Sequence, residues 1–323
     1  MTLKINKLLQ FLAFLFLLCL ALLLLTDKWY IFAVKKGLGV WVATVMPTVF
    51  PYLFVTAILC KMNITSKICF KGARLTKRLF RVGGASAGAL FTSLLCGYPL
   101  GAKCVADLKK GGLLSPTESQ RACVFCSSVS PVYVLTGVGL LAFNNRLFGV
   151  LLFVINLLSC LIMGLTFTFY NRKAKLTDLA LLPSNCDNVF YESLFTAISS
   201  TLFLGGVIVL STIVCESLLA FAPFNLLVKG ASNLFDSNLL AQGLFTGLVE
   251  YTYGIRIIAS QGLTFWTLPL CSLLCGFGGI CVNIQCLFFL KGAKIKIMPY
   301  LFSKVGQGLI CFLLGLVFNL FIL

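Results

Sequence analysis

The sequence predicts an all-α polytopic membrane protein with about seven transmembrane helices and two re-entrant helical hairpins, arranged as an inverted-topology repeat. Of its 323 residues, 59% are hydrophobic and only 11% are charged, and the mean hydropathy is +1.02. This composition is too apolar for a soluble domain and indicates several membrane spans. Gly and Pro also interrupt the apolar runs, and at membrane depth an opened backbone must face protein or a water-filled cavity.

The basic residues are distributed as the membrane class predicts. The formal net charge is +17, but Lys and Arg occur in short clusters between apolar runs. They form no basic face interleaved with aromatic residues, which a nucleic-acid partner would favour. The positive-inside rule explains the distribution better. We therefore expect the lipid bilayer of a bacterial cell membrane as the partner and no nucleic acid, while a homo-oligomer stays open.

No cofactor, metal or catalytic centre is expected. The fifteen cysteines lie mostly within apolar runs, and the chain has no histidine. Cys123 and Cys126 form a lone C-x-x-C, which indicates small packing residues in helices rather than a metal or redox site. Without histidine, a Ser or Cys nucleophile lacks its usual base, so the chain is not expected to be an enzyme.

The N-terminal apolar run is predicted to be retained as a membrane anchor helix. The run from Leu8 to Leu25 follows Lys4 and Lys7 and ends without a small-residue cleavage site, which places the N-terminus in the cytoplasm. The rest of the chain divides into a first repeat, a polar linker and a second, inverted repeat. The four parts, in order, are residues 1–29, 30–175, 176–189 and 190–323.

Each repeat is predicted to contain a span, a hairpin, a broken span and a further span. In the first repeat, the run from Tyr30 to Cys60 is long enough to cross the membrane, and Pro47 and Pro51 near its centre predict a kink. The segment from Lys61 to Arg81 carries seven basic residues and no acidic one. We expect it to be a cytoplasmic loop.

The stretch from Gly83 to Leu108 either crosses the membrane or enters and returns. If it crosses, Lys109 and Lys110 lie outside, and so does the basic cluster from Arg172 to Lys175, which violates the positive-inside rule twice. A re-entrant hairpin of two half-helices that meet at Gly97-Tyr98-Pro99 places both basic loops inside. The charges therefore favour the hairpin.

The second half repeats this order in the opposite orientation. An apolar run from Ser193 to Phe221 precedes a hairpin from Leu239 to Ser260. A run from Thr264 to Leu290 follows, and it is broken at Gly276 to Gly279. The last run, Ile297 to Leu323, leaves the C-terminus outside. In inverted repeats, discontinuous helices of both halves meet near the midplane around a substrate site.

Glu250 is the acidic residue with the strongest functional indication, because it sits at the break of the second hairpin. A charged side chain at membrane depth costs about 2.5–3.5 kcal/mol unless it is paired or hydrated, and it marks a functional site by default. The alternative is a structural pair with Arg256 or Lys103. A local pair between Lys103 and Asp107 is also plausible, because the two residues are four apart on one helical face.

Several neutral polar residues accompany Glu250 at the four breaks. Together they are predicted to line a pocket that recognises a small polar solute by hydrogen bonds. The alternative is that each of them binds a neighbouring helix, a contact worth only about 0.6 kcal/mol in membranes. The predicted substrate-binding residues are Tyr98, Ser127, Ser128, Ser130, Glu250, Thr252, Asn283 and Gln285.

Five strings carry a resemblance to a known family. They are Met46-Pro47-Thr48-Val49-Phe50-Pro51, Cys96-Gly97-Tyr98-Pro99-Leu100-Gly101-Ala102, Gly112-Leu113-Leu114-Ser115 with Glu118, Phe125-Cys126-Ser127-Ser128-Val129-Ser130-Pro131, and Gly276-Phe277-Gly278-Gly279-Ile280-Cys281-Val282-Asn283-Ile284-Gln285. From about residue 38 to 290 the chain resembles the sporulation integral membrane protein family of endospore-forming bacteria (YlbJ type), whose members carry nucleoside-recognition or Gate domains. The resemblance implies that both repeats are Gate-like and that the protein is connected with spore formation. It does not identify a ligand.

Two functions follow as expectations. The first is a transporter or channel-like protein of spore formation, which binds a small polar solute, for example a nucleoside-like one, at the midplane between two broken-helix hairpins. The alternative is a non-transporting membrane scaffold or signalling component of spore envelope (cortex) assembly, in which the hairpins only pack the fold. The residue at Asn283, where the family often has His, argues against a proton-linked role at that position.

Overall fold

The computed structural model describes residues 29–61, 64–171 and 188–321, and every regular element within these ranges is helical. The predicted anchor at residues 1–29 and the predicted linker at 176–189 lie almost entirely outside the described residues. Five described helical segments are long and apolar enough to cross a membrane. They are Tyr30–Leu59, Arg146–Phe169, Val189–Ala220, Thr267–Gly292 and Ile297–Phe318.

The first crossing is a single helical rod with a local change of pitch. It consists of α2 (Trp29–Val40), a π-helical turn η1 (Trp41–Val45) and α3 (Met46–Lys61), which contains Pro51. A proline removes one backbone donor from the helix, and π-turns are a common accommodation in interrupted helices. The expected interruption is therefore present, but the chain continues through it as helix.

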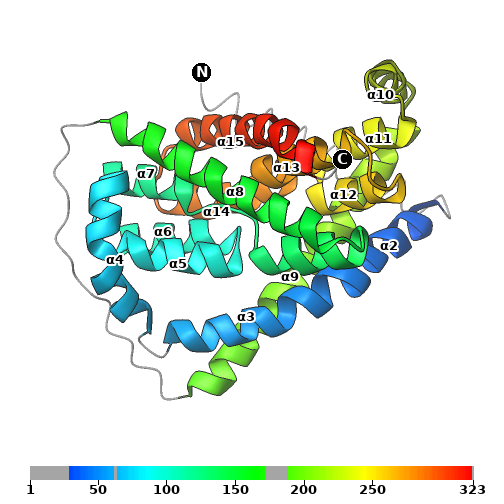
Figure 1. Ribbon diagram of the computed structural model, residues 1–323. Helices are drawn as coiled ribbons and strands as arrows, with labels where there is room; N and C mark the ends of the chain where they lie inside the picture. Colours follow the sequence, from blue (N-terminus) through cyan, green and yellow to red (C-terminus); the bar gives the residue numbers. More distant parts are fainter. Residues whose placement is uncertain (1–28, 62–63, 172–187, 322–323) are drawn as a thin grey trace, which may run out of the picture.

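The basic segment after this crossing is a helix rather than the expected loop. Helix α4 covers Ile64–Phe80 and lies along the side of the molecule against α5 (Figure 1). Thr76 and Phe80 face inward, four residues apart, whereas Arg74 and Arg78 are exposed. This spacing is that of an amphipathic helix. Helix α4 contains no continuous apolar run, so hydropathy alone does not predict it.

Helices α5 (Ser86–Cys96) and α6 (Leu100–Lys110) pack against each other as two arms that meet at Gly97-Tyr98-Pro99. The chain returns to where it entered, since the Gly83 amide donates to Glu118 Oε1 at 2.8 Å. Glu118 also closes a capping box with Ser115 at the start of α7 (Pro116–Phe125). A buried carboxylate therefore fixes both ends of the hairpin together.

The second half contains a matching pair of arms. Helices α11 (Asn238–Val249) and α12 (Tyr251–Ser260) pack together and meet at Glu250. The ends of the pair are joined by a hydrogen bond of 3.1 Å from Ser237 Oγ to Gln261 Oε1. Before this pair comes α10 (Ala222–Phe235), an amphipathic helix that is not among the predicted elements.

The two runs that were predicted to be broken spans each consist of two helical pieces. In the first half, α7 ends at Phe125, an irregular segment follows, and the π-helix η2 (Tyr133–Ala142) completes the run. In the second half, α13 (Thr267–Phe277) and α14 (Gly279–Gly292) are separated by Gly278. The remaining long helices are α8 (Arg146–Thr166, extended by η3 at Phe167–Phe169), α9 (Val189–Ala220) and α15 (Ile297–Phe318, followed by η4 at Asn319–Phe321).

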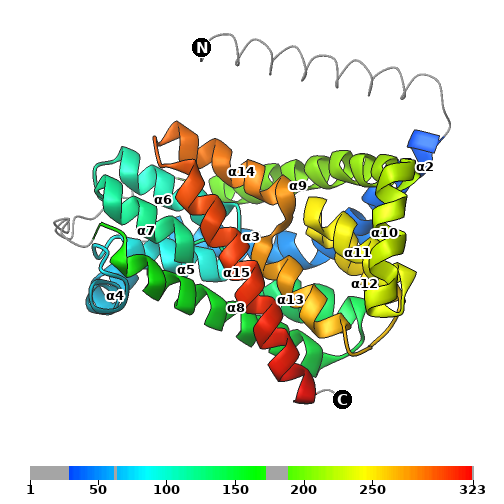
Figure 2. The same ribbon diagram turned by 90° about the horizontal axis from the view of Figure 1, so that it is seen from above.

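Elements of the first half of the chain pack against elements of the second half. The first crossing, α2 with α3, lies along α9, and α8 lies along α15. Helix α6 of the first hairpin contacts α14 of the second broken span, and α12 of the second hairpin contacts η2 of the first. The view from above shows α15 crossing close to α8 and α13, with the two hairpins on opposite sides of it (Figure 2).

Two of the basic loops lie at one end of the molecule. Lys109 Nζ donates to the carbonyl oxygen of Lys294 at 2.8 Å, and Gln120 exchanges two hydrogen bonds of 3.0 Å with the backbone of Lys296. Arg121 donates to the carbonyl oxygens of Arg81 and Tyr170. The first hairpin therefore starts and ends at the same end of the bundle.

Candidate functional site

The four helix breaks meet at one place inside the molecule. Gly97, with a φ of +72°, lies so close to Ser130 that a Cβ would stand 2.5 Å from the Ser130 nitrogen. Gly278, with a φ of +80°, approaches the ring of Tyr98. Both positions need glycine, because an L side chain rarely adopts this φ and would collide with its neighbour. The first hairpin is thereby pressed against both broken spans.

The second hairpin reaches the same place through its aromatic residues. The ring of Tyr251 packs edge-on against the rings of Tyr98, at 5.7 Å, and Tyr133, at 5.4 Å. These three tyrosines come from the first hairpin, the first broken span and the second hairpin. Together they form a buried aromatic wall that joins the two halves.

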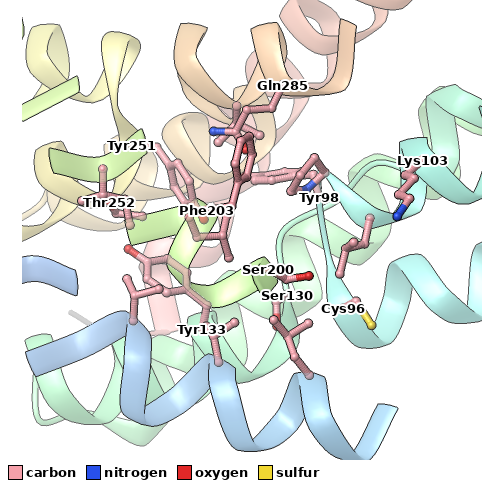
Figure 3. A pocket seen from close by; sticks show the side chains of 18 of the residues that line it. Cys96, Tyr98, Lys103, Ser130, Tyr133, Ser200, Phe203, Tyr251, Thr252 and Gln285 are labelled. Atoms are coloured by element: carbon pink, nitrogen blue, oxygen red, sulfur yellow. The ribbon is translucent and has the colours of Figure 1, made fainter. Parts of the chain in front are cut away.

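This wall borders a cavity of about 320 Å³ (Figure 3). Natural small-molecule pockets begin at about this size and combine apolar walls with a few polar groups. Apolar residues of the first crossing and of α9, such as Val49 and Phe203, also line the cavity. Polar lining residues are Tyr98, Lys103, Ser130, Tyr133, Ser199, Ser200, Glu250, Tyr251, Thr252 and Gln285.

Glu250 lies at the break of the second hairpin and is 1% exposed. Its Oε1 accepts hydrogen bonds from the Thr252 amide at 3.1 Å and the Thr252 hydroxyl at 2.8 Å, and its Oε2 accepts one from Ser211 Oγ at 3.2 Å. The carboxylate thus caps α12, where the helix dipole favours negative charge. Neutral donors hold it in place on the cavity wall.

The residues that were predicted as ionic partners do not pair with Glu250 in the part of the chain that the structure describes. Lys103, Asp107 and Arg256 are all exposed, and within the described residues none of them forms an ion pair. Lys103 nevertheless lines the cavity and is its basic lining residue. Asp107 and Arg256 lie outside the lining.

Two buried polar atoms of the lining lack a partner within the described part of the chain. They are Ser130 Oγ and Gln285 Oε1, whose residues are 9% and 7% exposed. A buried polar atom left unpaired costs about 1–3 kcal/mol. Such atoms in a cavity are available for a ligand or for water.

Three of the predicted site residues lie outside the lining and serve the helix breaks. The hydroxyl groups of Ser127 and Tyr300 are hydrogen-bonded at 3.0 Å, and the Ser128 carbonyl oxygen accepts from the Tyr98 amide at 2.7 Å. Asn283 Nδ2 donates to the carbonyl oxygens of Phe277 and Gly279, at 2.9 and 2.7 Å. These contacts satisfy backbone and hydroxyl groups that the breaks leave open.

Two charged residues near the site were not singled out from the sequence. Lys304 of α15 is 1% exposed and donates to the carbonyl oxygen of Ser127 in the first break. Lys36 of α2 forms an ion pair of 2.9 Å with Glu216 of α9, and the Tyr253 hydroxyl donates to the same carboxylate. A basic residue within an apolar run carries the same functional indication as an acidic one, and this signal could have identified both lysines from the sequence.

The broken helices, the long apolar segments and the cavity with its few polar groups define a membrane-embedded helical protein. The chain is similar to the sporulation integral membrane protein YlbJ of Bacillus subtilis (strain 168), with 25% identity over 302 residues that span 85% of this chain and 74% of the relative. This similarity confirms the resemblance to YlbJ-type proteins and supports an integral membrane protein involved in sporulation. No protein-family model matches the chain, and no solved structure matches it.

Proposed function

We propose that the protein binds a small polar solute in the cavity between its two halves and moves it across a membrane of the sporulating cell by alternating access. The pair of unpartnered buried atoms, Ser130 Oγ and Gln285 Oε1, carries this proposal. They belong to different halves of the chain and line the same cavity. A solute that bonds to both would bridge the two halves.

The lining indicates the kind of solute. Tyr98, Tyr133 and Tyr251 provide flat apolar surfaces, and the hydroxyl and amide groups provide neutral hydrogen-bonding partners. A polar solute with a flat ring, such as a nucleoside, satisfies both features. Glu250 then supplies a carboxyl group at the end of the cavity formed by the second hairpin.

The packing of the two halves supports an inverted repeat, which is part of the same proposal. Each half has the order span, amphipathic helix, hairpin, broken span and span. Each hairpin contacts the broken span of the other half through α6 with α14 and α12 with η2. In transporters built from inverted repeats, the site lies at this kind of interface and one repeat moves against the other.

A thermal-shift screen on the purified full-length protein tests the binding step. We expect at least one solute from a panel of nucleosides, nucleobases, amino acids and sugars to raise the thermal midpoint. Glu250→Gln and Gln285→Leu should abolish that rise, because each changes a polar group of the lining. Gln242→Leu is the matched control, since Gln242 lies on the second hairpin outside the lining, and it should keep the full response.

A sporulation assay of variants separates this function from the scaffold alternative. A scaffold is favoured by the exposed basic face of α4, which carries Lys71, Arg74 and Arg78. It should tolerate Glu250→Gln in sporulation and lose function when these three residues are replaced. A normal spore yield with Glu250→Gln, at an unchanged protein level, would contradict the transport proposal.

A further inference from the structure

Lys304 places a buried ammonium group at the break of the first broken span. It is the eighth residue of α15, a long apolar helix of the second half, and only 1% of its surface is exposed. The side chain reaches the irregular segment between α7 and η2, 177 residues earlier in the chain. A lysine at this depth is costly and needs a specific reason.

The contacts of the ammonium group are oxygen atoms and aromatic rings. Nζ donates to the carbonyl oxygen of Ser127 and, at 2.7 Å, to Oε1 of Gln307. It lies 5.7 Å from the ring centre of Tyr98 and 5.9 Å from that of Tyr300. Carbonyl oxygen, amide oxygen and aromatic faces are the partners that proteins offer to a cation.

The groups that face Lys304 from the neighbouring helices are neutral. They are thiols and phenols, and within the described residues no carboxylate pairs with Nζ. The facing groups are Cys123 of α7, Cys160 of α8, Cys286 of α14, Tyr98 of the first hairpin, and Tyr300 and Cys311 of α15 itself.

The charge is instead balanced by the open end of a helix. Ser127 comes two residues after the last residue of α7, Phe125, where unpaired carbonyl groups and the helix dipole favour a cation. In broken-helix transporters the unwound carbonyl groups and C-terminal helix ends coordinate Na⁺ or a proton from solution. Here a lysine from the opposite half occupies such a position.

We propose that the Lys304 ammonium group occupies, at the first helix break, a site of the kind that binds an alkali-metal ion in other proteins. The protein thus supplies the cation of this site from its own chain. The site links α15 to the segment that carries Ser130 and lies directly behind Tyr98, so it holds one wall of the cavity in its binding shape. The effect on the cavity wall rests on the proposed function, because it concerns the binding of a solute there. The proposal implies that solute binding does not require Na⁺. The occupancy of the cation site itself is independent of any solute.

Removing the side chain should create a site for an external cation. We expect Lys304→Ala to lower the thermal midpoint of the full-length protein by roughly 10 °C, because it leaves the carbonyl oxygen of Ser127 and the end of α7 without their partner. Sodium chloride or methylammonium chloride should restore a large part of this loss. Choline chloride at the same ionic strength should not, because choline is too large for the site.

The wild type and a matched lysine variant are the controls. The midpoint of the wild type should be equal in sodium and choline chloride. Lys229→Ala removes a lysine of α10 whose side chain is exposed, so small cations should leave its stability unchanged. A wild type that needs sodium, or a folded Lys304→Ala protein that ignores every small cation, contradicts the proposal.

Two further variants cover the case in which Lys304→Ala does not fold. Lys304→Arg keeps the positive charge and Lys304→Met keeps the apolar stem. A cation site predicts that the arginine variant is the more stable of the two, whereas a packing role predicts the reverse order.

If cations rescue Lys304→Ala but no solute stabilises the wild type, the proposed function fails and the cation site stands. If a solute binds only in the presence of sodium, the cation site fails and solute binding stands.

Discussion

The hydroxyl of Tyr98 donates a hydrogen bond of 2.9 Å to the carbonyl oxygen of Cys275. Tyr98 lies at the tip of the first hairpin, and Cys275 is in the last turn of α13, just before the second broken span opens. The bond therefore satisfies a carbonyl group at the end of a helix in one half with a side chain from the other. The same tyrosine offers its ring to the cavity and to the Lys304 ammonium.

Replacing Tyr98 separates these two roles. Tyr98→Phe keeps the ring and removes the hydroxyl, so it should lower the free energy of unfolding by about 1–3 kcal/mol, because the Cys275 carbonyl loses a buried partner. Solute binding should persist, since the aromatic surface remains. Tyr98→Ala should lose stability and binding together. Thermal unfolding with and without a binding solute measures both effects, and Tyr191→Phe on an exposed tyrosine is the control.

Gly97 should tolerate no side chain. Gly97→Ala combines a φ of +72° with a Cβ 2.5 Å from the Ser130 nitrogen, so the hairpin tip must move away from the first broken span. We expect a loss of more than about 3 kcal/mol or failure to accumulate in the membrane. Gly206→Ala has open space around its Cβ and lies within α9, so it should be neutral or slightly stabilising. Normal accumulation and stability of Gly97→Ala would contradict the tight approach of the two breaks.

The ion pair of Lys36 with Glu216 should be coupled to Tyr253. Lys36→Met leaves the carboxylate with its tyrosine partner, while Tyr253→Phe leaves it with the lysine. Because one side of the pair is 38% exposed, each single change should cost only about 1 kcal/mol. The double variant should cost more than the sum of the two, because the buried Glu216 then has neither partner. Additive losses in a double-mutant cycle would show that the three groups act separately.

The ends of the first hairpin should be reachable from one side of the membrane. Lys109 contacts Lys294, so Lys110→Cys and Lys294→Cys should react with an impermeant thiol reagent from the same side. Asn145→Cys, at the start of α8, and Gln261→Cys, at the end of α12, should react from the opposite side. Labelling of the unmodified protein provides the background, because the native cysteines that the structure describes are buried or half-buried. Labelling of Lys110→Cys from the side of Asn145 would exclude the hairpin.

The order of the elements was predictable because each has a local signature. Apolar length predicts α8, α9 and α15, and glycine or proline within an apolar run predicts the breaks at Gly97 and Gly278. The charges of the loops predict that the first hairpin returns to the side from which it enters the membrane, and this stays a prediction. The contact of Gly83 with Glu118 shows that the two ends of the hairpin lie together. Helices α4 and α10 were missed, because amphipathic helices have no long apolar run and their identification requires the helical period to be examined.

The site was predictable only in part. Glu250, Thr252, Gln285, Ser130 and Tyr98 were selected because they lie at breaks, and the structure brings these five to one cavity. Their neighbours Ser127 and Asn283 have the same kind of position in the sequence, but their polar groups turn to Tyr300 and to the backbone of the second break. The local backbone conformation at each break decides whether a polar side chain points to the cavity or to a neighbouring helix, and hydropathy carries no information about that conformation.

The sequence by itself determined a helical membrane protein, the places where its helices break and the end of the bundle to which its basic loops belong. These properties follow from apolar length, backbone hydrogen-bonding and charge, each of which acts over a short segment. Only the tertiary structure decided that Lys304 donates to the carbonyl oxygen of Ser127 at the first break and that Tyr98 pairs with Cys275, because both contacts join segments 177 residues apart. Such pairings depend on how the two halves pack, and no local pattern encodes them.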